Sequence, residues 1–82
     1  MHRHLTAALY KFVELPDHAA LREPLQRVCE GQGVKGTLLL APEGINGTIA
    51  GPPAGVEAVL DWLRDDPRLA DLTPKTAWAD QP

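Results

Sequence analysis

A very short connection between two strand-like runs constrains the fold most. The runs are residues 34–41 (VKGTLLLA) and 45–50 (INGTIA), and only Pro42-Glu43-Gly44 separates them. Three residues are too few for the crossover that joins parallel strands, so the two runs should pair as an antiparallel hairpin. Because Asn and Gly tolerate turn conformations, Asn46-Gly47 suggests a tight turn, and a hairpin loop with a glycine bulge is the simplest prediction for this segment.

The flanking segments predict two helices and two more strands. Residues 5–13 are rich in Leu, Tyr, Phe and Val, as strands are. A helix follows, with Asp17 as its N-cap, a kink or a separate first turn at Pro24, and an apolar stripe at Leu21, Leu25, Val28 and Cys29. Gly31 and Gly33 supply its stop signals. A second helix carries Val56, Val59, Leu60 and Leu63 on one face, and a last short strand is predicted over residues 75–79.

The predicted order is therefore β-α-β-β-α-β, within a single domain of residues 1–82. Right-handed crossovers place both helices on the same face of a four-stranded antiparallel sheet. This is the α+β ferredoxin-like (split β-α-β) sandwich. A chain of 82 residues is near the lower limit for folding alone.

The other face of that sheet is predicted to be covered. A solvated face would be polar at every second position of a strand. In the first strand, however, one alternating set contains Leu5, Ala7 and Leu9, and the other contains Ala8, Tyr10 and Phe12. We expect another domain or a second copy of the chain to cover this face. The alternative is a solvated surface that tolerates a few apolar residues.

Charge and composition restrict the possible partners and location. The net charge is −3, from eight Lys and Arg against eleven Asp and Glu, so the chain is a poor candidate for holding nucleic acid unaided. Cys29 is the single cysteine and allows no internal disulfide, which favours a reducing cytoplasm. The sequence contains no apolar run of the ~20 residues that a membrane span needs, and its first residues lack a signal peptide's apolar region.

Three activities common on this fold are disfavoured by the residues present. An acylphosphatase needs a cationic, glycine-rich anion cradle after the first strand, whereas this chain has Glu14-Leu15-Pro16-Asp17. An RNA-recognition domain needs aromatic residues on its central strands, and the second and third strands hold none. A copper chaperone needs a Cys-x-x-Cys loop, which the sequence lacks.

The remaining polar residues have simpler interpretations. His2 and His4 form at most an incomplete metal site, and His18 is interpreted as a surface residue. Cys29 is predicted to be buried beside Leu25 and Val28 rather than nucleophilic, since Glu30 beside it raises its pKa. The acidic helix end of Asp61, Asp65 and Asp66 is interpreted as a solvated face. We assign no catalytic, cofactor-binding or metal-binding residue.

Residues 35–51 (KGTLLLAPEGINGTIAG) resemble the signature of the bacterial tRNA uridine hydroxylases, a rhodanese-related family. Residues 9–13 (LYKFV), 20–25 (ALREPL) and 58–63 (AVLDWL) are also similar to that family, so the resemblance covers almost the whole chain. Its most specific part is a loop whose role the resemblance does not give: Glu43, Gly44, Ile45, Asn46, Gly47 and Thr48.

The resemblance implies an acylphosphatase-like N-terminal domain in a longer cytoplasmic enzyme. In the family, a basic strand and a rhodanese domain with the active-site cysteine follow, and the enzyme uses molecular oxygen to convert the tRNA wobble uridine to 5-hydroxyuridine. Cys29 does not match that cysteine. We therefore expect a non-catalytic accessory domain, without a cofactor of its own, that packs on the rhodanese domain and helps to position tRNA. The alternative is a small-ligand-binding regulatory domain of the amino-acid-sensing type, which often dimerises through its sheet.

Overall fold

The computed structural model describes residues 4–79 and confirms the predicted order of elements. An additional short 3₁₀ helix, η1, follows the second helix. The elements are β1 (His4–Phe12), α1 (His18–Gly31), β2 (Lys35–Ala41), β3 (Gly44–Gly51), α2 (Pro53–Arg64), η1 (Pro67–Leu69) and β4 (Lys75–Ala79).

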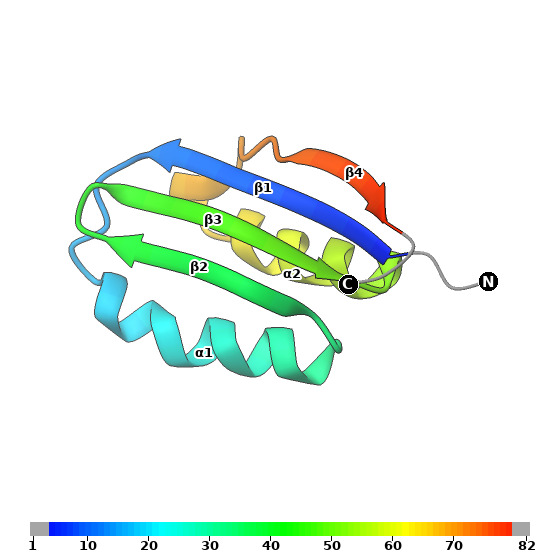
Figure 1. Cartoon of the computed structure of the whole chain (residues 1–82). Helices are drawn as coiled ribbons and strands as arrows, with labels where there is room; N and C mark the ends of the chain where they lie inside the picture. Colours follow the sequence, from blue (N-terminus) through cyan, green and yellow to red (C-terminus); the bar gives the residue numbers. More distant parts are fainter. Residues whose placement is uncertain (1–3, 80–82) are drawn as a thin grey trace.

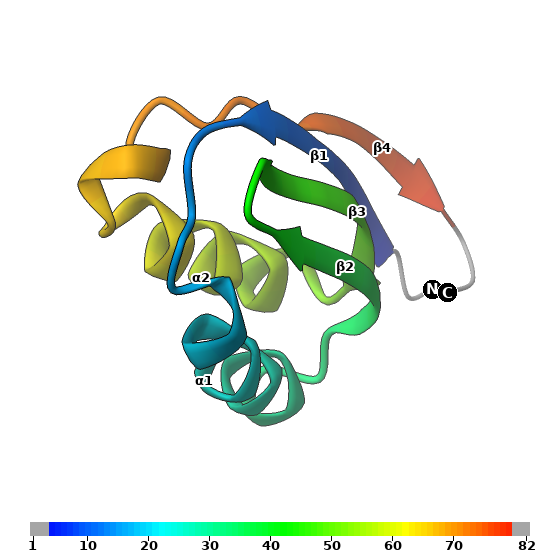
Figure 2. The ribbon, with the colours of Figure 1, turned by 90° about the vertical axis from the view of Figure 1, so that its left-hand side faces the viewer.

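The four strands form one antiparallel sheet in the order β2-β3-β1-β4, so β1 and β3 are central (Figure 1). Both helices lie on the same side of this sheet, and the opposite side carries no element of the described chain (Figure 2). This arrangement is the predicted ferredoxin-like sandwich. We refer to the side without helices as the open face.

The hydrophobic core fills the space between the sheet and the helices. Alternate residues of β1 point into it, and Leu5, Ala7 and Leu9 are buried. They meet Ile49 of β3 and the apolar stripe of α2, which consists of Val56, Val59, Leu60 and Leu63. Each fully buried Leu or Val contributes about 1.5–3 kcal/mol relative to an exposed one, so this shared core determines which face of the sheet the helices cover.

Helix α1 differs from the sequence prediction in two details. Asp17 occupies the N-cap position, but its side chain makes no capping hydrogen bond and is instead paired with Arg68. Pro24 lies inside one continuous helix rather than after a separate first turn. Pro24 and Ala20 are both exposed, so the carbonyl that loses its partner lies on the solvent side. The predicted stop is confirmed, because Gly33 adopts φ +68° immediately after the helix.

The hairpin differs from the prediction as well. The turn between β2 and β3 consists of Pro42 and Glu43, whereas Asn46 and Gly47 lie within β3. Gly47 has φ +149°, and a Cβ at this position would lie 2.0 Å from the carbonyl oxygen of Thr37 on β2. The glycine is therefore required by the close approach of two strands and not by a turn, a requirement that local turn propensity does not reveal.

None of the helices within residues 4–79 is long and apolar enough to cross a membrane.

Candidate functional site

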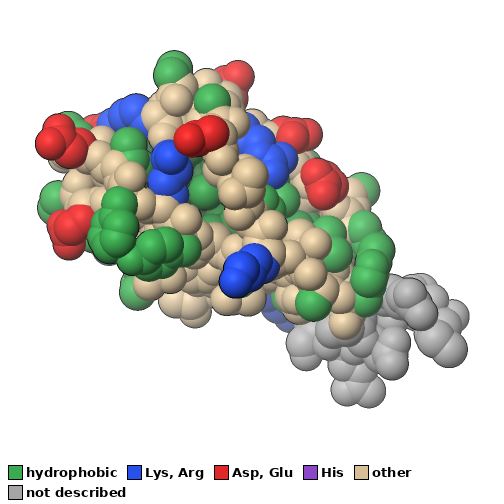
Figure 3. Space-filling view, turned by 90° about the horizontal axis from the view of Figure 1, so that it is seen from above, with side chains coloured by type: hydrophobic (Ala, Val, Ile, Leu, Met, Phe, Trp, Pro, Cys, Tyr) green, Lys and Arg blue, Asp and Glu red, His purple; other side chains and the backbone are tan. Residues whose placement is uncertain are grey.

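Large apolar side chains gather at one end of the open face. Tyr10 and Phe12 of β1 are 64% and 72% exposed, and Leu39 of β2 is 61% exposed. The rings of Tyr10 and Phe12 are in edge-to-face contact, with centroids 5.0 Å apart. We call these three residues the open-face patch. Hydrophobic side chains also reach the surface in the space-filling view of Figure 3.

The open-face patch borders a hollow of about 320 Å³. Its floor and rim combine apolar and polar groups from three strands and the hairpin turn. The lining residues are Tyr10, Lys11, Phe12, Leu39, Ala41, Glu43, Gly44, Ile45 and Asn46. Four residues of the family-signature loop therefore belong to this hollow.

The signature loop divides its side chains between the two faces of the sheet. Asn46 is exposed and pairs with Tyr10 on one side and Leu39 on the other, so it lies in the middle of the open-face patch. Thr48, two residues further along β3, is also at the surface. Ile45 is buried in the core on the opposite side. The signature loop thus contributes Ile45 to the core and Asn46 to the centre of the open-face patch.

Gly44 lines the hollow at a point where no side chain would fit. It pairs with Phe12 and has φ +144°, and a Cβ here would lie 2.0 Å from the carbonyl oxygen of Lys11. Any side chain at this position would therefore clash with the β1 backbone. The glycine allows β1 and the hairpin turn to come together under the exposed Phe12.

The turn between β1 and α1 cannot bind an anion through the backbone N–H groups of Val13 and Leu15, because they already donate to carbonyl groups of the hairpin. The backbone N–H of Val13 donates to the carbonyl of Glu43 at 2.9 Å, and that of Leu15 donates to the carbonyl of Pro42 at 2.9 Å. Leu15 itself is fully buried. An anion cradle needs backbone N–H groups that point at the ligand. Here two of them are already bonded to the hairpin.

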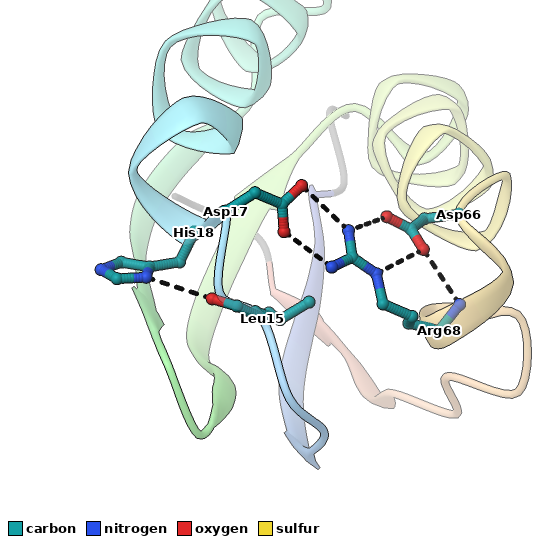
Figure 4. Close-up of polar contacts among 5 residues, drawn as sticks. All are labelled: Leu15, Asp17, His18, Asp66 and Arg68. Carbon is teal, nitrogen blue, oxygen red and sulfur yellow. Dashed lines mark hydrogen bonds and ion pairs between the residues drawn. The ribbon is translucent and has the colours of Figure 1, made fainter.

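The cation beside this turn is neutralised by two carboxylates. Arg68 of η1 lies between Asp17 and Asp66 (Figure 4). Its hydrogen bonds, from the side chain first and then from the backbone N–H, lower the pKa of Asp66 to about 2. The Arg68 side chain also lowers the pKa of Asp17, and the two carboxylates raise the pKa of Arg68. Asp66, interpreted from the sequence as part of a solvated acidic end, is instead paired and caps η1.

Cys29 is half-buried, so the prediction that it is buried is wrong. It packs against the core but also lines a groove of about 430 Å³ between α1 and β2. This exposure arises because α1 covers the edge strand β2 incompletely. Burial, and then the charge of Glu30, raises the pKa of the Cys29 thiol. A raised pKa keeps the thiol protonated at neutral pH and disfavours nucleophilic attack.

Comparisons with known proteins agree with this fold. Residues 4–82 match the family described as the UPF0176 acylphosphatase like domain. The chain belongs to this family. It is 68% identical over 75 residues to a tRNA uridine(34) hydroxylase of Albidiferax ferrireducens, covering 92% of this chain and 24% of the relative. It is 54% identical over 81 residues to one of Acaryochloris marina, covering 99% and 26%. The chain thus spans about a quarter of the length of the curated relatives it matches.

The histidines of this UPF0176-type domain form no cluster in the described region. His18 places its Nδ1 3.1 Å from the carbonyl oxygen of Leu15. His4 lies in β1, and His2 is outside the described residues. Within residues 4–79, no group of three or more His, Cys, Asp or Glu side chains could hold a metal ion.

Tyr10 and Phe12 make β1 the strand that carries exposed aromatic residues on the open face. The second and third strands hold no aromatic residue, but β1 is itself a central strand and places Tyr10 and Phe12 on the open face. The signal was the alternation within residues 5–13. Trp78 is also 58% exposed, but it pairs with the buried Leu5 and so lies on the helix side of the edge strand β4. It is not part of the open-face patch.

Proposed function

We propose that this chain is a non-catalytic N-terminal accessory domain of a tRNA uridine(34) hydroxylase. The parent enzyme would use molecular oxygen to form 5-hydroxyuridine at the wobble position, and this domain would support its rhodanese domain and help to position tRNA. The observation that carries the proposal is the similarity, at 54–68% identity, to relatives that bear the name tRNA uridine(34) hydroxylase and are about four times as long.

The chemistry of the described residues supports an accessory role. The β1–α1 turn uses its backbone N–H groups internally, and Arg68 is paired with two carboxylates. The thiol of Cys29 has a raised pKa and an acidic neighbour. A nucleophile or an anion site needs the reverse in each case: free donors, an available cation or a thiolate.

A domain-exchange experiment tests the proposal. The chimera carries this chain in place of the matched quarter of the A. ferrireducens relative, and it is expressed in a bacterium that lacks the hydroxylase. Mass spectrometry of digested tRNA should detect 5-hydroxyuridine at position 34 with the chimera and none with the 82-residue chain alone. The isolated chain should also show no acylphosphatase or sulfurtransferase turnover. Turnover by the isolated chain that disappears in Cys29→Ser would refute the accessory role.

The groove between α1 and β2 favours a second candidate function. Apolar residues line it together with three long polar residues of α1, which are Arg22, Gln26 and Glu30. A concave apolar site with a few polar groups is typical of small-ligand pockets. The corresponding proposal is a regulatory domain that senses amino acids. Thermal unfolding of the isolated chain with a panel of amino acids distinguishes the two functions, because a bound ligand raises the Tm increasingly as its concentration exceeds Kd.

A further inference from the structure

We propose that the open-face patch is a docking surface for the parent protein's own chain. Its occupant would be an apolar segment, without acidic residues, from the three quarters of the relatives' length that this chain does not match. This inference rests on the proposed function only in that a longer parent protein supplies the segment. It specifies that the open face of the domain makes the contact, through the residues of the open-face patch.

The large apolar residues of the open face are confined to one of its ends. Tyr10, Phe12 and Leu39 are each more than 60% exposed and surround a single hollow. The residues toward the other end of the same face are small or polar, as on a solvated sheet: Thr6, Ala8, Lys35, Thr37, Thr48 and Lys75. Contiguous apolar patches on small domains mark interaction sites, whereas single exposed apolar residues do not.

Charge identifies the class of occupant. Lys11 is the one cation among the described residues that line the hollow. It is already paired, because its Nζ lies 2.8 Å from Asp71 Oδ1. The acidic group at the rim is Glu43. RNA binding depends on cations that remain free to neutralise phosphates. A neutral-to-acidic apolar hollow instead suits a polypeptide segment, for which Asn46 offers both a hydrogen-bond donor and an acceptor.

The proximity of the partner makes such a modest patch sufficient. A segment of the same chain is held near its site at an effective concentration in the millimolar range when a short flexible linker joins them. Three large side chains and one central amide can therefore dock without the area that two separate proteins need.

Residue-specific thiol labelling tests the docking. Leu39→Cys, and Lys35→Cys as the matched control on the same strand, are placed in the isolated chain and in the full-length chimera described above. Labelled peptides are quantified by mass spectrometry, so other cysteines do not interfere. We expect Leu39→Cys to react on the order of tenfold more slowly in the chimera than in the isolated chain, which corresponds to an opening free energy of about 1.4 kcal/mol. Lys35→Cys should react at the same rate in both.

Each other outcome overturns the proposal. Equal labelling of Leu39→Cys in both proteins would mean that the patch is free in the parent. Protection that requires added tRNA would make it an RNA surface, and protection in the isolated chain that grows with its concentration would make it a dimer interface. A second variant, Leu39→Asp, should leave the Tm of the isolated chain unchanged and speed proteolysis between this domain and the rest of the chimera. Neither readout requires hydroxylation, so docking and the proposed function fail or succeed separately.

Discussion

Arg68 donates two hydrogen bonds to the carboxylate of Asp17, from Nη1 at 2.6 Å and from Nη2 at 3.2 Å, across 51 positions of the sequence. The same guanidinium donates to Asp66 from Nε at 3.0 Å and from Nη2 at 2.6 Å. The start of α1 is thereby tied to η1, which follows α2. This contact joins the two halves of the β-α-β-β-α-β chain on the side of the helices.

The planar fork of Arg68 should be more important than its charge. Arg68→Lys keeps a cation but cannot bind two carboxylates with paired N–H groups. We expect both Arg68→Lys and Arg68→Gln to lower the Tm by a few degrees at most, because ion pairs that water still reaches contribute little to stability. Thermal unfolding by circular dichroism measures this. If Arg68→Lys matched the wild type while Arg68→Gln did not, charge alone would account for the contact.

Acid should weaken the domain through the same cluster. The folded-state pKa of Asp66 is about 2, below its ordinary value of 3.8, and the pKa of Asp17 is lowered as well. A depressed folded pKa gives stability that is complete above the unfolded pKa and is lost as the pH falls through the folded pKa. Urea denaturation should therefore show stability falling between about pH 4 and pH 2.

Matched variants isolate the contribution of Asp66. Asp66→Asn should make the decline below pH 4 shallower and lower the stability at pH 7. Asp65→Asn replaces the adjacent carboxylate, for which the described residues provide no ion pair, and should follow the wild-type curve. An unchanged acid dependence in Asp66→Asn would place the titrating carboxylates elsewhere.

Gly47 should tolerate the addition of a methyl group as poorly as Gly44, the other glycine of the signature loop. Its φ is +149°, and the carbonyl oxygen of Thr37 would lie 2.0 Å from the Cβ of an alanine placed there. We expect Gly47→Ala to destabilise the domain by on the order of 2–4 kcal/mol. This is a large part of the roughly 4–12 kcal/mol that a domain of 82 residues has. Gly31→Ala is the control, because nothing lies within 4 Å of its Cβ and alanine suits a helix. Comparable losses in both variants by urea denaturation would contradict this packing.

Cys29 should react slowly with a thiol reagent under native conditions. Its pKa is raised by burial and by Glu30, so the thiolate is scarce at neutral pH. Labelling should accelerate in denaturant, and Glu30→Gln should accelerate it in buffer by lowering the pKa. Glu23→Gln, which alters an exposed ion pair with Arg27 on the same helix, should not. Immediate, complete labelling of the native wild type would show that the groove leaves the thiol open.

The order and layers of the fold could be predicted because they depend on local periodicity. The short connection at residues 42–44 requires a hairpin, and the helical spacing of Val56, Val59, Leu60 and Leu63 identifies the buried face of α2. Two of the wrong details depend on tertiary contacts. Asp17 pairs with Arg68 and does not cap its own helix. Position 47 lies in a strand and must be glycine, because the Thr37 carbonyl comes close to it.

The surface could be predicted only in part. Alternation in residues 5–13 indicates that the second face of the sheet is apolar, and Tyr10 and Phe12 confirm this. The sequence does not show that Leu39 and Asn46 join them, because that depends on the pairing of β3 with both of its neighbours. Nor does it show which cations are already paired.

The last prediction concerns tRNA and follows from those pairings. Among the described cations, Lys11, Arg27, Arg64 and Arg68 have carboxylate partners within 4.0 Å. Of the other three, Arg22 lies on α1, whereas Lys35 and Lys75 lie on the open face, on the two edge strands, with β3 and β1 between them. A phosphate backbone could therefore engage about two of them, which gives a log–log salt slope near −2 and a Kd no better than about 10⁻⁴ M at physiological salt.

Titration of a labelled anticodon stem–loop with the isolated chain at two salt concentrations measures both quantities. Lys35→Gln should reduce the slope by about one, since it removes one of the two contacts. Arg27→Gln, which removes an already paired cation from α1, should leave it unchanged. Micromolar binding with a steep slope would instead make this domain the main RNA-holding surface of the parent enzyme. In that case the open-face patch would have to be reconsidered as a stacking platform for bases rather than a docking surface for protein.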